Sequence, residues 1–284
     1  MVTKADIQAG LRELGIKPGF GLMVHASLKS FGVVQGGVKT VIEALMAAVT
    51  PEGTLLMPSF NHATIFQEDG SSYFDPLTTP TTNGIIPDTF WRMPGVFRSL
   101  NPTHAFAAWG KHARRYTEFH HRTLTMGPQS PLGLLYADDG YGLFIGVGYA
   151  ANTFHHVVEM SLGVPCLGLR TEAYPVVLPD GRQVQGRTWG WRERFCPLTD
   201  EGGYYDAMPA RGLQREVMVG QSRLILFRLR DCFAVVAEIL QTGQDGFPPC
   251  SGCPIRPRQI WATVKSDWDE QSQRLVPDSA AWQY

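Results

Sequence analysis

The amino-acid sequence predicts an α/β fold, with a single domain, a central mixed or parallel sheet flanked by helices, and a cleft at the strand ends. Strand-like and helix-like runs alternate over residues 19–58, as in a β–α–β unit with parallel strands. Two further apolar runs, at 142–148 and 217–228, supply more strands. Because 44% of the 284 residues are hydrophobic, the chain can bury a large core.

The first elements are a helix, two strands and the helix between them. Residues 1–15 are amphipathic and charged and lack the apolar core of a signal peptide, so they predict a first helix. G-F-G-L-M-V-H (19–25) is typical of a buried strand. The apolar residues of V-K-T-V-I-E-A-L-M-A-A-V (38–49) recur at helical spacing, and G-T-L-L-M-P (53–58) is a strand stopped by its proline.

The later elements complete the sheet and leave two irregular stretches. G-L-F-I-G-V-G (142–148) predicts a third buried strand, 217–228 a hairpin or strand, and 231–241 a helix. Residues 60–110 are rich in Pro, Thr, Asn and aromatic residues, and so much irregular chain in a compact domain usually lines a site. We therefore expect 60–110 and 180–212 to form the side of the cleft that receives a substrate.

Composition excludes several classes of partner. The formal net charge is −1, so no overall field favours nucleic acid or an acidic membrane surface. The sequence has no run of about 18 apolar residues, so we expect no transmembrane helix. The five cysteines are scattered and odd in number, which favours free thiols in a reducing compartment, and we expect a cytoplasmic protein. Composition makes no prediction of oligomeric state.

Polar residues follow three of the predicted strands. Ligands of α/β sheets bind where the carboxyl ends of strands open into loops. The three ends are H-A-S (25–27), P-S-F-N-H (58–62) and G-V-G (146–148), the last of which leads into Asn152 and Thr153. Their convergence predicts a site at this edge of the sheet.

The stretch A-N-T-F-H-H-V-V-E-M (151–160) carries the strongest candidate chemistry. His155 lies four residues and His156 three residues before Glu159, so either imidazole can share a helix face with the carboxylate. A carboxylate bonded to one imidazole nitrogen sets the tautomer and raises the basicity of the other nitrogen, which suits a general base. A surface His–Glu pair is the simpler interpretation. A metal site of the H-E-x-x-H type is absent.

Two other patterns are less specific. Gly36 and Gly37 precede a helix, where backbone N–H groups can face a phosphate, but Val38 occupies the place of the glycine that precedes the lysine in a P-loop. Cys250 and Cys253 form a C-x-x-C pair with no second pair nearby, so a proline-rich loop with free thiols competes with a zinc site.

Eight sequence blocks occur in order along the chain, and together they are far more specific than any one of them. They are V-H-A-S-L-K-S-F-G-V-V-Q-G-G (24–37), E-G-T-L-L-M-P-S-F (52–60), F-D-P (74–76), G-I-I-P-D (84–88), F-R-S-L-N-P-T-H-A-F-A-A-W-G (97–110), G-P-Q-S-P-L (127–132), I-G-V-G-Y-A-A-N-T-F-H-H-V-V-E (145–159) and V-G-Q-S-R-L (219–224). In these blocks the chain resembles the aminoglycoside 3-N-acetyltransferase family, over about residues 5–240.

The resemblance implies a reaction and a choice between the two histidines. Members carry N-T-x-x-H-x-x-E, which selects His156 as the base and Glu159 as its orienter, with His155 at a variable position of modest importance. The implied reaction transfers acetyl from acetyl-CoA directly to an amine in a ternary complex, without a metal. The implied acceptor is the 3-amino group of a 2-deoxystreptamine aminoglycoside.

The resemblance also implies binding residues and an extent for the domain. We expect residues 1–245 to form the acetyltransferase domain and 246–284 a C-terminal extension packed on it. Lys29 is expected near a phosphate of CoA, against the simpler interpretation of a solvated turn. The expected cofactor contacts are His25, Ser27, Leu28, Lys29, Ser30, Phe31, Gly32, Gly36, Gly37, Arg98 and Ser99. The expected acceptor contacts are Asn61, Asp75, Asn152, Thr153, Glu193 and Asp206.

The acceptor is where the sequence departs from the family pattern. Aminoglycosides are polycations, yet R-T-W-G-W-R-E-R-F (187–195) is aromatic and basic. A non-aminoglycoside amine is therefore an alternative acceptor, and Arg98 has an internal ion pair as its alternative role. Two other classes compete: a non-catalytic CoA-binding protein, and a metal-dependent hydrolase using His25, His62, His104 and His156.

Overall fold

The computed structural model describes most of the chain up to residue 242 and two short strands beyond it. The described residues are 1–61, 73–123, 125–164, 173–178, 180–187, 196, 198–200, 202–242, 268–269 and 274–275. Among them, no helix combines the length and the apolar character needed to cross a bilayer.

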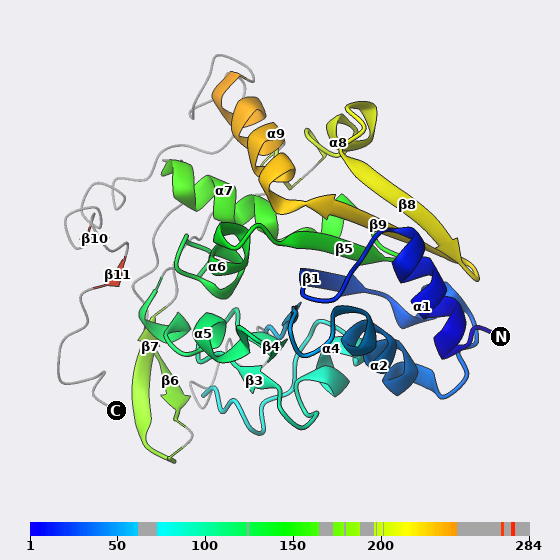
Figure 1. Ribbon diagram of the computed structural model, residues 1–284. Coiled ribbons are helices and arrows are strands. Elements are labelled where there is room, and N and C mark those ends of the chain that lie inside the picture. The colour runs from blue at the N-terminus through cyan, green and yellow to red at the C-terminus, as the bar shows by residue number, and fades with distance from the viewer. Residues whose placement is uncertain are drawn as a thin grey trace.

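A seven-stranded mixed sheet forms the centre of the described structure, in the order β3-β4-β2-β1-β5-β9-β8 (Figure 1). β1 lies between β2 and β5 and is parallel to both, whereas the outer neighbours pair antiparallel. The predicted mixed sheet is thus confirmed. The strands are β1 (Gly21–Ala26), β2 (Thr54–Pro58), β3 (Phe97–Arg98), β4 (Phe106–Gly110), β5 (Tyr141–Ile145), β8 (Gln214–Val219) and β9 (Ser222–Arg228).

Helices cover both faces of the sheet (Figure 1). Side chains alternate along β1, so Leu22 and Val24 pack in one apolar cluster and Met23 in the other. The first cluster includes residues of α1 (Lys4–Glu13), α2 (Gly37–Val49) and α4 (Ile85–Phe90). The second includes residues of α5 (Ala113–Thr117), α6 (Pro131–Ala137), α7 (Phe154–Leu162), α8 (Ala207–Ala210) and α9 (Leu229–Thr242). Short 3₁₀ turns are η1 (Leu28–Phe31), η2 (His120–Arg122) and η3 (Tyr149–Ala151).

Local chemistry explains where the helices begin. Thr3 caps α1 through a capping box with Asp6, in which each side chain bonds the backbone of the other residue. Ser130 caps α6, and Pro131 occupies its first turn, where its missing N–H costs nothing. α2 starts after Gly36, whose φ of 77° favours glycine.

The predicted helices and strands are confirmed, but the expected irregular regions hold regular structure too. Residues 60–110 contain α4, β3 and β4, and 180–212 contains β7 (Gln183–Arg187), paired with β6 (Ala173–Val177). β4 lacks a strand signature because F-A-A-W-G neither alternates nor contains a β-branched residue. In the expected extension 246–284, the described strands β10 (Trp268–Asp269) and β11 (Arg274–Leu275) pair antiparallel. The rest of it lies outside the described residues, and its packing stays a prediction.

Gly146 is where β5 ends and the loop toward α7 begins, and it offers a direct test of this packing. Its φ is 64°, and a Cβ atom there would overlap Ser30 Oγ. Gly146→Ala is therefore expected to lower the free energy of unfolding by about 2–4 kcal/mol, measured by urea denaturation. Gly148 has a φ of −130° and no atom within 4 Å of a built Cβ. Gly148→Ala should stay within about 0.5 kcal/mol of the parent, and equal losses would contradict the argument.

Candidate active site

The ends of β1 and β5 meet as the sequence predicted. The Ser27 N–H donates to Ile145 O at 2.9 Å, which joins the two strand ends. The Ser30 hydroxyl lies 2.7 Å from Ser222 Oγ and donates to Ser27 O. These bonds hold η1 against the end of β5, immediately before the segment that enters α7.

His156 and Glu159 form an imidazole–carboxylate pair on α7. Because a carboxylate only accepts, the His156 Nδ1–H donates to Glu159 Oε2, at 2.9 Å. The Glu159 side chain is fully buried, and 33% of the His156 side chain is exposed. With the Nδ1 proton engaged, the lone pair of the neutral ring lies on Nε2.

Thr199 completes the environment of the buried carboxylate. Its hydroxyl donates to Glu159 Oε1 at 2.6 Å, and its side chain is buried. Each oxygen of Glu159 therefore receives a donor from a different part of the chain, one from α7 and one from the turn 196–200. Two such bonds restrict the rotation of the carboxylate and, through it, the orientation of the His156 ring.

His155 belongs to a second pair beside the first. Its Nε2 lies 3.1 Å from Asp200 Oδ1 and its Nδ1 3.2 Å from the Tyr204 hydroxyl. Its ring centroid is 4.2 Å from that of His156, at an interplanar angle of 73°. Burial lowers the pKa of His155, as does the nearby His156 ring. His155 is thus a fully bonded interior residue, which the sequence did not predict.

Asp200 ties the turn 196–200 together as well as binding His155. Its other carboxylate oxygen accepts the Cys196 N–H at 2.6 Å, and its own N–H donates to Cys196 O at 2.8 Å. The Tyr205 hydroxyl donates to Asp200 O at 2.7 Å. The turn that presents Thr199 to Glu159 is therefore closed by the bonds between Cys196 and Asp200, at its two ends.

The predicted cofactor residues divide into a turn at the sheet edge and two interior residues. Lys29 is exposed, and its ammonium group has no partner among the described residues. No side-chain atom lies within 4 Å of a Cβ built on Gly37, so the approach to its backbone is open. Leu28 and Phe31 instead pack against the α1–α2 apolar cluster, and Gly32 ends η1 with a φ of 74°.

Arg98 and Ser99, in contrast, make structural bonds. The Arg98 guanidinium donates to the carbonyls of Ser59, Pro76 and Thr79 and lies over the Trp91 ring, 4.3 Å from its centroid. The alternative internal ion pair is not seen for Arg98 in the described part of the chain. Ser99 is buried. Its hydroxyl lies 2.8 Å from His120 Nδ1 and accepts the Phe106 N–H.

His25 reaches toward α7 rather than toward the turn. Its Nε2 lies 3.4 Å from Thr153 Oγ1, the side chain at the start of α7. Burial lowers the pKa of His25 to about 4, with a smaller contribution from His155. His25 is therefore neutral near pH 7 and cannot serve there as a cation for phosphate.

Sequence comparison shows the family to which the chain belongs. The family profile described as aminoglycoside 3-N-acetyltransferase matches residues 23–241, more than half of the chain. The chain belongs to the aminoglycoside 3-N-acetyltransferase family. Aminoglycoside N(3)-acetyltransferase IV from Salmonella sp is 36% identical over 248 residues, covering 85% of this chain and 88% of that protein.

Solved structures of acetyltransferases share the fold. A histidine-to-alanine variant of aminoglycoside acetyltransferase AAC(3)-IVa, in complex with a gentamicin, matches with a TM-score of 0.70 and 33% identity, over 89% of this chain and 94% of that one. AAC-IIIb, in a binary complex with CoASH, matches with a TM-score of 0.72 and 25% identity, over 84% and 96%. The resemblance read from the eight blocks is confirmed, and the protein is an acyltransferase of this family.

The residues expected to contact the acceptor come from several parts of the chain, and their acceptor role stays a prediction. Asn152 is buried and donates to the Tyr204 hydroxyl, while its Oδ1 accepts the Phe154 N–H. Asn61 is buried and donates to Pro102 O. The Asp75 carboxylate accepts the Leu77 N–H across the intervening Pro76. Asp206 is exposed at the start of α8. Glu193 lies outside the described residues.

The hydrolase alternative requires His25, His62, His104 and His156 to lie together, and those of them that the structure describes do not form a metal-binding group. The one possible metal-binding group found among the described residues consists of His155, His156 and Asp200, without His25 or His104. His104 instead packs its ring against Phe60, with a centroid distance of 4.9 Å. His62, Cys250 and Cys253 lie outside the described residues.

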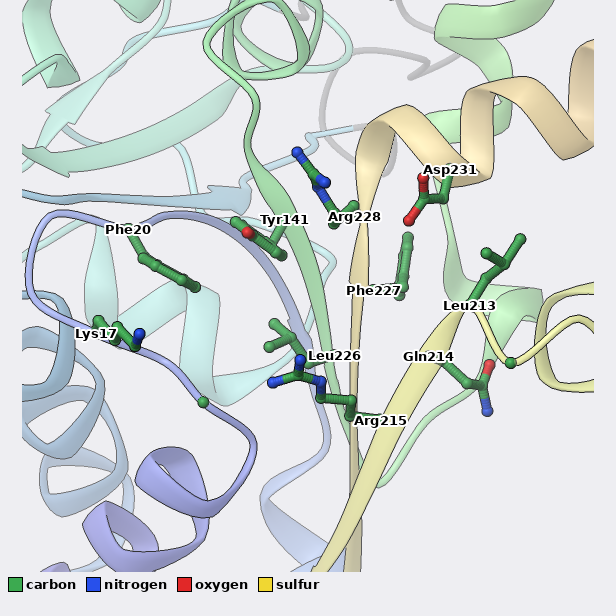
Figure 2. A pocket seen from close by; sticks show the side chains of 12 residues that line it. Lys17, Phe20, Tyr141, Leu213, Gln214, Arg215, Leu226, Phe227, Arg228 and Asp231 are labelled. Carbon is green, nitrogen blue, oxygen red and sulfur yellow. The ribbon is translucent and has the colours of Figure 1, made fainter.

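A pocket of about 420 Å³ lies away from the candidate site (Figure 2). It opens at the amino ends of β1 and β5, between the stacked rings of Phe20 and Tyr141 and the start of β8. Lys17 and Arg215 also line it. The His156–Glu159 pair follows the carboxyl end of β5, so this pocket is not the candidate catalytic site.

Thr199 offers a test of carboxylate positioning. Thr199→Val keeps the shape but removes the donor to Glu159, so kcat for acetyl transfer should fall about tenfold, a loss of about 1.4 kcal/mol. The KM for the acceptor should change little, because Thr199 is buried behind the carboxylate. Thr199→Ser retains the hydroxyl and should restore most of the rate. Equal rates for the Val variant and the parent would remove Thr199 from the site.

Proposed function

We propose that this protein transfers an acetyl group from acetyl-CoA to the 3-amino group of a 2-deoxystreptamine aminoglycoside. His156 is the general base, and Glu159 orients it. The observation that supports this most directly is the 2.9 Å bond from His156 Nδ1 to the buried Glu159, on a ring that is still one-third exposed. This arrangement leaves Nε2 as the nitrogen that can accept a proton from a substrate.

The chemistry follows from the protonation state of the acceptor. An alkylammonium group has no lone pair, so the amine must lose a proton before it can attack a thioester. His156 Nε2 accepts that proton while the amine nitrogen bonds to the acetyl carbonyl carbon. As the tetrahedral intermediate collapses, the C–S bond breaks and the second proton of the nitrogen passes to the departing sulfur, which gives the amide and CoA as its thiol. His156 then releases its proton to solvent. Both substrates are bound together, and no acetyl-enzyme is formed.

The buried carboxylate of Glu159 stabilises the positive charge that forms on His156 during the reaction. When Nε2 takes up the proton, the imidazole becomes cationic, and Glu159 stabilises it from 2.9 Å. Glu159 is already bonded to Thr199, so little reorganisation accompanies this change. The pair therefore favours the transition state over the resting state.

The cofactor is proposed to lie along the turn from Ser27 to Gly37. Lys29 is exposed there without a described partner, and the approach to Gly37 at the start of α2 is open. Backbone N–H groups at a helix N-terminus and a nearby ammonium group both favour phosphate. The CoASH complex of the related AAC-IIIb supports CoA as the cosubstrate, and the gentamicin complex of AAC(3)-IVa supports an aminoglycoside as the acceptor.

Replacement of the base gives the most direct kinetic test. His156→Ala is expected to lower kcat by about 10²–10⁴-fold, because a positioned base contributes that much. CoA binding, measured by calorimetry, should persist. His112→Ala is a matched control, since His112 lies at the start of α5 on another part of the fold. Activity of His156→Ala within a few-fold of the parent would exclude the proposed base.

The acceptor is tested by thiol release from acetyl-CoA with a panel of amines that includes gentamicin-, kanamycin- and apramycin-type aminoglycosides. CoA release that depends on an aminoglycoside is the expected result. Release only with other amines would retain the reaction and change the acceptor. CoA binding without release for any amine would instead support the non-catalytic alternative.

A further inference from the structure

We propose that His155, His156 and Asp200 form a zinc site, and that zinc bound there inhibits acetyl transfer by occupying the catalytic base. The inhibitory part of this proposal rests on the proposed function of His156. The binding part depends only on the described geometry.

The three side chains already approach the spacing of a metal site. One ligand atom from each lies within 4.8 Å of the other two. His155 Nε2 and Asp200 Oδ1 are 3.1 Å apart. Tetrahedral zinc with bonds of 2.0–2.2 Å needs ligand atoms about 3.3–3.6 Å apart, so this pair needs little change. His156 is the most exposed of the three, and its ring would make the remaining movement.

Each ligand also has the outer partner that metal ligands usually have. A carboxylate or carbonyl bonded to the far nitrogen orients a ligating imidazole. His156 has Glu159 in this position, and the Tyr204 hydroxyl lies 3.2 Å from Nδ1 of His155. The second oxygen of Asp200 accepts the Cys196 N–H. Two imidazoles and a carboxylate, with a fourth position left for water, form a ligand set that zinc accepts.

Metal binding requires a change of tautomer at one histidine only. His156 already directs its Nε2 lone pair away from Glu159, because its proton is on Nδ1. His155 must move its proton from Nε2 to Nδ1 to ligate the metal, after which Tyr204 accepts a hydrogen bond from it. The affinity for zinc should fall at low pH, because protons compete with the metal for the imidazole nitrogens and the carboxylate.

The consequence is direct competition for one lone pair. His156 Nε2 can accept a proton from the amine or bind zinc, but it cannot do both. Zinc should therefore lower kcat/KM for the acceptor while leaving CoA binding intact. A chelator should restore the rate, whereas a catalytic metal would show the opposite response.

The test uses Co²⁺ as a spectroscopic probe on the full chain, with Zn²⁺ as competitor. One equivalent of Co²⁺ is expected to give the visible absorption of a tetrahedral nitrogen- and oxygen-ligated ion, displaced by Zn²⁺. His156→Gln, at a partly exposed position, and Asp200→Asn should each weaken binding by at least about tenfold. His112→Gln should bind like the parent. No tetrahedral band, or an unchanged band in both ligand variants, overturns the proposal.

Two controls separate this site from other zinc chemistry. The Cys250→Ser, Cys253→Ser double variant should retain the Co²⁺ band. Loss of the band in this variant, or a thiolate charge-transfer band in the parent, would assign the metal to the cysteines. Acetyl transfer, followed by product mass because zinc binds the released thiol, should fall in buffered Zn²⁺ and recover with EDTA. If the Co²⁺ band appears but no acetyl transfer is detected under any condition, the metal site is supported and the proposed function is contradicted. Transfer that is unaffected by Zn²⁺ at full occupancy would remove the inhibition.

Discussion

The buried carboxylate of Glu159 is the constraint on which the site depends. An ionised group without water is costly unless hydrogen bonds satisfy its oxygens. One donor, His156, comes from one turn earlier on α7, and the other, Thr199, comes from 40 residues later. The position of α7 and the conformation of the turn 196–200 are therefore coupled, and the orientation of the imidazole follows from both.

Two neighbouring histidines obtain different roles from their surroundings alone. His155 is enclosed by Asp200 and Tyr204 and is part of the interior, whereas His156 has a carboxylate behind it and solvent access in front. The same chemical group is a scaffold in one place and a candidate base in the other. Because their rings are in contact, a change in either one affects the other.

The sheet explains why these groups meet. β1 is bonded on both sides to parallel strands, so the polar residues after β1 and β5 must emerge at one edge. Alternation along β1 places His25 on the same face as Met23, toward α7, and Thr153 meets it there. Gly146 lets the turn of Ser30 pack directly against the end of β5. The proposed cofactor turn and the proposed base are thereby held on one rigid frame.

Sequence alone determined the β–α–β core, the helix that carries His156 and Glu159, and the family, because these depend on local periodicity and on ordered blocks of residues. It did not reveal the antiparallel strand β4, whose short F-A-A-W-G run has no alternation. Nor could it reveal the bonds that Arg98, Ser99 and Asn152 make within the fold, since their partners lie far away in the sequence. Only the tertiary structure brought Thr199 and Asp200 to α7, because contacts across 40 or more residues leave no trace in local spacing.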